Sequence, residues 1–154
     1  MKSNKLALIA LLLWVITMAV VAWYFIRGNT AAGTDGRTAI VLRTAERDMI
    51  LSEMRGLLSA TQVIIDGVNQ PDRNRIIQSS RSVGMGAAAD VNPALMAKFP
   101  LAFKTLAFSV HREMDDIAKA AETGKPVAEL LTMMSNVLVK CNACHASWQI
   151  KAGD

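Results

Sequence analysis

The chain has 154 residues, of which 52% are hydrophobic and 19% charged, and its formal net charge is +4 at pH 7. The basic excess lies near the N-terminus, because the residues from Gly33 onward hold 14 Lys and Arg against 13 Asp and Glu. Nucleic-acid binding, which requires a clustered basic face, is therefore not expected. Few aromatic residues beside many Ala, Leu and Met favour one helical domain with a modest core.

An uncharged apolar run, residues 6–26, dominates the N-terminal part of the chain. About 20 apolar residues span a bilayer as a helix, and the aromatic residues 23–25 suit a membrane interface. We predict a transmembrane signal anchor over residues 1–27 that contacts lipid through residues 6–26. A cleaved secretory signal is the alternative, and Ala31-Ala32 offers it a weak cleavage site.

The charges around this run predict the topology of the anchor. Lys2 and Lys5, together with the free amine, favour a cytoplasmic N-terminus, so the chain after Arg27 lies outside the cytoplasm. Residues 28–36 (GNTAAGTDG) are small and polar and predict a short flexible linker.

The remaining residues, 37–154, show helical periodicity interrupted by turn signals. Four helices joined by short loops predict an all-α domain, with an antiparallel four-helix bundle as the default architecture. The expected helices cover residues 37–68, 72–89, 101–122 and 126–151, with a short turn at 94–98. The last helix carries an apolar stripe at helical spacing, formed by Leu130, Leu131, Met134, Val137, Leu138, Cys141, Cys144, His145 and Trp148.

The sequence Cys141-Asn142-Ala143-Cys144-His145 on this stripe is the attachment signature of c-type haem. Cys141 and Cys144, the only cysteines, can each form a thioether to the porphyrin, and His145 can bind the iron as the proximal ligand. Because the motif continues the core face, one covalent haem c is expected inside the bundle. Covalent haem attachment also takes place outside the cytoplasm of bacteria, in agreement with the predicted topology.

Other interpretations of the same residues are weaker. A redox dithiol usually lies near a βαβ pattern, which is not seen around this motif. A zinc site needs four ligands, and His111 could complete the set, but the adjacent Cys144 and His145 lack the usual spacers. A disulfide between the two cysteines would close too small a loop to constrain the chain much.

With this motif near its C-terminus, the chain resembles the class II c-type cytochromes, the family of cytochrome c-prime and its low-spin relatives. The resemblance covers residues 43–151 and is most specific at 141–148 (CNACHASW), with further similarity at 99–104 and 111–115. It implies a four-helix bundle and, by analogy, a homodimer formed through the first two helices. A basic residue common in the family is replaced by Gln149.

The resemblance also bears on the side of the iron opposite His145. The family pattern makes Leu51 the distal residue, which would block a five-coordinate iron. Met54 lies one turn later on the same helix face and is our candidate for a sixth ligand, although a methionine at helical spacing is more often core filler. Met49 is a weaker candidate, because it falls on another face of the helix.

Three further residues have weaker assignments. Arg43 and Arg47 are candidates for haem-propionate contacts, as an arginine on this helix is in relatives, and solvated helix charges are an equal alternative. His111 is interpreted as a partly exposed histidine bonded to a nearby carboxylate, with a propionate contact as the alternative.

The expected function is single-electron transfer by a c-type cytochrome tethered to the bacterial inner membrane, single-pass, with its haem domain in the periplasm. We expect an electron carrier and not an enzyme, since no nucleophile–base pair stands out. The expected partners are membrane-bound or periplasmic redox proteins. The alternatives are a five-coordinate haem protein that binds nitric oxide or carbon monoxide, and an accessory haem subunit of a respiratory complex.

Overall fold

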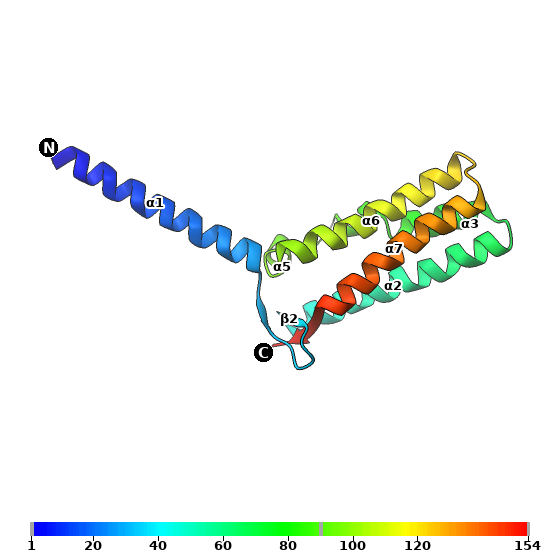
Figure 1. Cartoon of the computed structure of the whole chain (residues 1–154), viewed down its shortest axis with the longest axis horizontal. Helices are drawn as coiled ribbons and strands as arrows, with labels where there is room; N and C mark the ends of the chain where they lie inside the picture. Colours follow the sequence, from blue (N-terminus) through cyan, green and yellow to red (C-terminus); the bar gives the residue numbers. More distant parts are fainter. Residues whose placement is uncertain (1, 90, 154) are drawn as a thin grey trace.

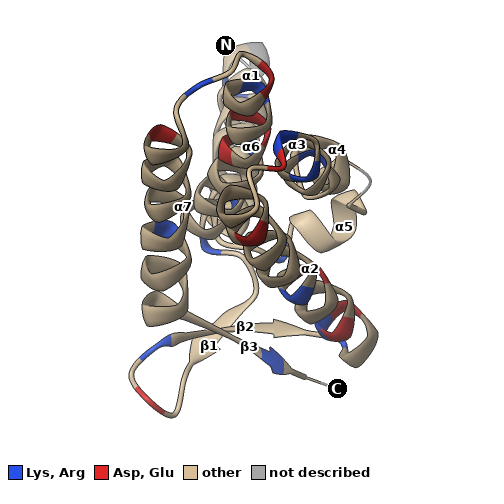
Figure 2. Ribbon diagram, turned by 90° about the vertical axis from the view of Figure 1, so that its right-hand side faces the viewer, with Lys and Arg blue, Asp and Glu red and all other residues tan. Residues whose placement is uncertain are grey.

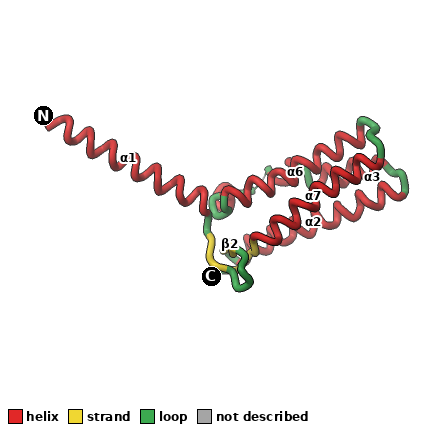
Figure 3. Tube along the Cα trace, in the orientation of Figure 1, coloured by secondary structure: helices red, strands yellow, loops and turns green. Residues whose placement is uncertain are grey.

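The computed structural model describes residues 2–89 and 91–153, and the fold is mostly helical. Met1, in the predicted anchor, and Asp154, in the predicted domain, lie outside the described residues. The side chain of Lys2 is also not described. Figures 1 and 3 show one helix that projects away from a body of packed helices, with short strands at the junction. The elements are α1 (Lys2–Arg27), β1 (Thr30–Ala32), β2 (Thr38–Leu42), α2 (Thr44–Asn69), α3 (Arg73–Ser82), α4 (Met85–Ala88), α5 (Pro93–Met96), α6 (Leu101–Glu122), α7 (Val127–Ser147) and β3 (Trp148–Ala152).

The projecting helix α1 is apolar along its length and its large hydrophobic side chains are exposed. The stretch Asn4–Arg27 is long and apolar enough to cross a membrane, as signal sequences near an N-terminus also are. Gly28 ends the helix with a positive φ of 64°, and its N–H donates to the carbonyl of Tyr24. This is the usual role of a glycine after a helix C-terminus.

Long helices α2, α6 and α7 run beside one another, and α3 packs against both α2 and α6 (Figure 1). Their apolar stripes meet in one core, as the spacing of three and four in the sequence requires. This first core lies toward the end of the body that is remote from α1 (Figure 1), and its fully buried members include Ile64, Ile76, Met114, Ile117, Leu130 and Val137.

A small sheet of order β1-β2-β3 is the main departure from the expected all-α domain. β1 pairs antiparallel with β2, and β2 pairs parallel with β3, so that Thr38 lies opposite Trp148. The β-branched residues in 38–42 favour a strand. Part of the predicted flexible linker is therefore strand β1, and the helices α2 and α7 are shorter than the expected 37–68 and 126–151.

A second core lies at this sheet end of the body, and it positions the site. It contains Ile40, Leu42, Ile50, Leu95, Phe99 and Phe103, with Met54, Cys144 and Trp148 packed against it. Phe103 stacks on Phe99 and meets the edge of Trp148, with ring centroids 5.0 and 5.7 Å apart. The aromatic contact with Phe103 and the pairing with β2 explain why the chain turns from helix into strand at Trp148.

Candidate functional site

A cavity lies between α2, α6 and α7, next to the second core. The cavity encloses about 120 Å³ and opens to solvent. Most of the lining side chains are apolar, among them Ile50, Leu57, Phe99, Phe103 and Phe108. An apolar cavity with a few polar groups is typical of sites for cofactors and small molecules.

The last turns of α7 bring the whole CxxCH motif to this cavity. Cys141, Cys144 and His145 all line it, because positions i, i+3 and i+4 share one face of a helix. Cys141 packs against the first core and Cys144 against the second, so the motif lies between the two. His145 is exposed, which leaves its ring accessible to a ligand in the cavity.

The two cysteines are free, half-buried thiols. Burial raises the pKa of the Cys141 thiol, and burial together with the neighbouring Cys141 raises the pKa of Cys144 to about 11. Both groups are therefore protonated near neutral pH. Dithiol redox chemistry requires thiolates, so this environment does not favour it.

On α2, Met54 lines the same cavity as the motif, and Leu51 is not among the lining residues. Met54 is half-buried against the second core. Met49 is 46% exposed, in agreement with its expected place on another face of the helix. The structure thus brings one of the three proposed distal residues, Met54, to the cavity that His145 lines.

His111 on α6 also lines the cavity, and it is buried, with 5% exposure, and not partly exposed as expected. Its Nδ1 lies 2.9 Å from the carbonyl oxygen of Val83, and its Nε2 lies 3.2 Å from Glu53 Oε1. The Glu53 carboxylate is the main cause that raises the pKa of His111. Since both ring nitrogens have partners, this imidazole is held in place and is not free to bind a metal.

Two lysines in the cavity wall were not singled out from the sequence. Lys140, directly before the motif, forms a 2.5 Å ion pair with Glu113. Lys104 lies in the first turn of α6 and is 7% exposed. The signal that could have found Lys104 is the spacing of residues 104, 107, 108 and 111, which places all four on one helix face.

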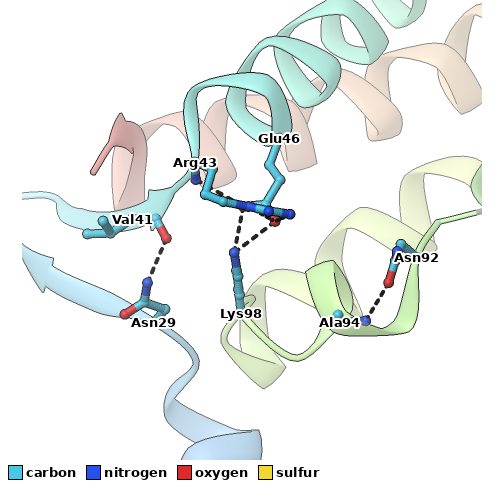
Figure 4. Close-up of polar contacts among 7 residues, drawn as sticks. All are labelled: Asn29, Val41, Arg43, Glu46, Asn92, Ala94 and Lys98. Atoms are coloured by element: carbon cyan, nitrogen blue, oxygen red, sulfur yellow. Dashed lines mark hydrogen bonds and ion pairs between the residues drawn. The ribbon is translucent and has the colours of Figure 1, made fainter. Parts of the chain in front are cut away.

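Arg43 and Arg47, the predicted propionate residues, are not among the side chains that line the cavity. The Arg43 guanidinium, with its side chain 77% exposed, pairs with Glu46 at 2.7 Å, and Figure 4 shows this contact beside Lys98. Arg47 pairs with its neighbour Asp48 at 2.9 Å. Both arginines thus contact carboxylates of α2.

Residues 2–89 and 91–153 contain no group of three or more His, Cys, Asp or Glu side chains arranged to hold a metal ion. Figure 2 shows how few charged residues α7 carries. The arrangement instead offers two thiols, one accessible imidazole and the thioethers of Met54 and Met96 around an apolar space. These are the groups that attach and ligate a haem.

Comparison of the chain with protein-family models, with curated proteins and with solved structures found no match. The features of the chain that bear on its function are therefore the motif, the cavity and the anchor-like helix.

Proposed function

We propose that the protein is a membrane-tethered c-type cytochrome that transfers single electrons between redox partners. In this proposal the helical body is a four-helix bundle of the class II type, formed mainly by α2, α3, α6 and α7, and it holds one haem. The observation that carries the proposal is the cavity that unites the CxxCH motif of α7 with Met54 of α2. Neither thiols nor a histidine alone would require apolar walls, whereas a porphyrin does.

The residues present fit a haem. Cys141 and Cys144 would hold it by thioethers, His145 would supply the proximal nitrogen, and Met54 would supply the distal sulfur. Haem iron contributes the one-electron redox chemistry, and the protein contributes burial, axial ligands and a docking surface. The apolar walls, including Phe103 and Phe108, exclude water from the site.

The structure also supports the proposal that α1 is an uncleaved anchor. Cleavage near Ala31-Ala32 would cut strand β1, which pairs with β2. It would also remove Phe25, whose carbonyl oxygen accepts a hydrogen bond from the buried Lys104 ammonium at 3.2 Å. A retained α1 places the body on the periplasmic side of a bacterial inner membrane, where the partners are membrane-bound or periplasmic redox proteins.

Covalent haem is the test of this proposal. The purified full-length chain should carry one haem that acid–acetone does not extract, measured as the pyridine haemochrome. The double variant Cys141→Ala/Cys144→Ala should lose all non-extractable haem. Asn142→Ala, an exposed position inside the same motif, should retain it. Fully extractable haem, or zinc bound in equal amount to the wild-type protein, would refute the proposal.

A further inference from the structure

Lys104 is the buried cation that the proposed haem site leaves unexplained. Its side chain lines the cavity from the first turn of α6 and is 7% exposed. Burial lowers the pKa of Lys104, as expected for an ammonium that has lost much of its hydration. A charge is rarely buried in proteins without a partner of opposite sign, because desolvation is costly.

In the described part of the chain, the polar contacts of the Lys104 ammonium are with the last turn of α1. Its Nζ donates to the carbonyl oxygen of Phe25 at 3.2 Å and lies 3.7 Å from the centroid of the Phe25 ring. These contacts are favourable, but they do not neutralise the charge. An ammonium has three N–H donors, and this hydrogen bond occupies one of them.

Other cations of the cavity are already neutralised by carboxylates. Lys140 pairs with Glu113, and His111 lies against Glu53. Among residues 2–89 and 91–153, Lys104 has no carboxylate oxygen within 4.0 Å. The cavity wall thus presents one cation whose charge is left without a counter-charge by the described side chains.

We propose that Lys104 is a binding residue for an anionic carboxylate inside this cavity, namely a propionate group of haem. The inference rests on the proposed function and deepens it. A propionate would supply the missing counter-charge and accept a charge-assisted hydrogen bond from Nζ. This role replaces the one expected for Arg43 and Arg47, whose contacts lie elsewhere.

The Lys104 Nζ atom also makes the last turn of α1 part of the proposed cofactor site. The Phe25 carbonyl and ring hold the Lys104 ammonium at the end of α1, so the last turn of the anchor orients a side chain that lines the cavity. A change at Phe25 should therefore reach the haem through Lys104, although Phe25 is not among the cavity-lining residues.

The test compares full-length variants in detergent, after the pyridine haemochrome has shown that each carries covalent haem. If the wild type carries none, the proposed function fails, and this result is distinct from a failure of the inference. The variants are Lys104→Met, Lys104→Arg and Phe25→Leu. Lys151→Met on the exposed part of β3 is the matched control for loss of one positive charge at the same end of the body.

Resonance Raman spectra report the propionate bending mode, which depends on the hydrogen bonds of that carboxylate. Lys104→Met should shift this mode to lower frequency and lower the midpoint potential, because loss of a nearby positive charge favours ferric haem. Lys104→Arg should keep most of the potential, Phe25→Leu should give a smaller shift of the same sign, and Lys151→Met should change neither quantity.

An unchanged propionate mode in Lys104→Met would overturn the inference, even if stability fell. If Lys104→Met does not fold, the mode in Lys104→Arg decides, because a guanidinium must change the hydrogen bonds of a bound propionate.

Discussion

Met54 is the side chain on which the iron chemistry of the proposed site depends. With a methionine sulfur as sixth ligand, ferric haem should be low-spin and show a weak long-wavelength sulfur-to-iron band in its optical spectrum. Met54→Leu should remove this band, make the ferric iron high-spin and, after reduction to the ferrous state, allow rapid binding of carbon monoxide. Optical and magnetic-resonance spectra of the ferric protein measure the change.

Met49→Leu is the matched control for this prediction, since Met49 lies on the same helix and is 46% exposed. Its spectrum should equal that of the wild type. A high-spin wild type that binds carbon monoxide or nitric oxide at once would show that Met54 is only a core residue, and gas binding would then replace electron transfer as the function.

The stability of the fold should depend on pH through Glu46, which lies in the first turn of α2. Its carboxylate accepts from Arg43 Nε at 2.9 Å and from Lys98 Nζ at 2.6 and 2.8 Å, and these partners lower its pKa from 4.5 to about 2 (Figure 4). A carboxyl group with a lowered folded-state pKa stabilises the fold above its unfolded pKa, and this contribution disappears as the pH falls through the folded value. Wild-type stability should therefore fall between about pH 5 and pH 2.

The comparison that isolates this effect is Glu46→Gln. Its urea midpoint should be lower than that of the wild type at pH 6, and the two midpoints should converge toward pH 2. Glu129→Gln, which breaks an exposed contact with Lys125, should follow the wild-type profile closely. A constant difference between Glu46→Gln and the wild type over this range would contradict the assignment.

At the scale of elements, the junction between α1 and the body is closed around Gly28. A Cβ atom on this residue would lie 2.5 Å from the Lys98 carbonyl oxygen and 2.6 Å from the Phe99 carbonyl carbon, and its φ of 64° strains any β-branched residue. Asn29 continues the junction, because its N–H donates to Lys98 O at 2.7 Å and its side chain to Val41 O at 2.8 Å.

Gly28→Val should open this junction, at a strain cost of about 1–3 kcal/mol. Hydrogen exchange measured by mass spectrometry should show faster exchange over residues 28–32, with the core of α6 unchanged. Gly56→Ala is the control, because the added Cβ meets nothing within 4 Å there and should stabilise helix α2 by about 0.5–1 kcal/mol. Equal protection of residues 28–32 in Gly28→Val and the wild type would show that the contact is dispensable.

The long helices could be predicted from sequence because their cores follow local periodicity. α6 spans Leu101–Glu122 as expected, between Pro100 and a glycine at 124 with positive φ. The parallel pair could not be predicted, because β2 and β3 are far apart in sequence and meet only in the folded chain. The expected helix 72–89 is broken at Gly84, where the Asp115 carboxylate of another helix accepts from Met85 N at 2.8 Å.

In the site, too, the features set by helical spacing could be predicted from sequence, and the contacts between helices could not. The CxxCH spacing on α7 and the phase of Met54 on α2 both place side chains at the cavity, because helical geometry is local. The partners of His111 and Lys104 depend on which helices meet, and a single sequence does not show this. The carboxylate expected beside His111 is that of Glu53, which comes from α2 and not from the helix of His111.

At the scale of the whole molecule, the proposed anchor predicts how the protein fractionates. The full-length chain should remain with membranes through high-salt and carbonate washes, because retention by an apolar helix does not depend on charge. N-terminal sequencing of the membrane-bound protein should find the residues around Lys2. A soluble product that begins near Ala31 or Gly33 would identify α1 as a cleaved signal.

The parallel pairing of β2 with β3 has a consequence for the order in which the protein matures. Thr38 lies opposite Trp148, so the sheet cannot be completed until the segment 148–152 has been synthesised. Before then, β1 and β2 form only a two-stranded hairpin, which is marginally stable alone, and such distant pairing is slow to form. The segment 141–145 leaves the ribosome before β3. If the protein carries covalent haem as proposed, the attachment chemistry can therefore reach the motif before β3 has paired.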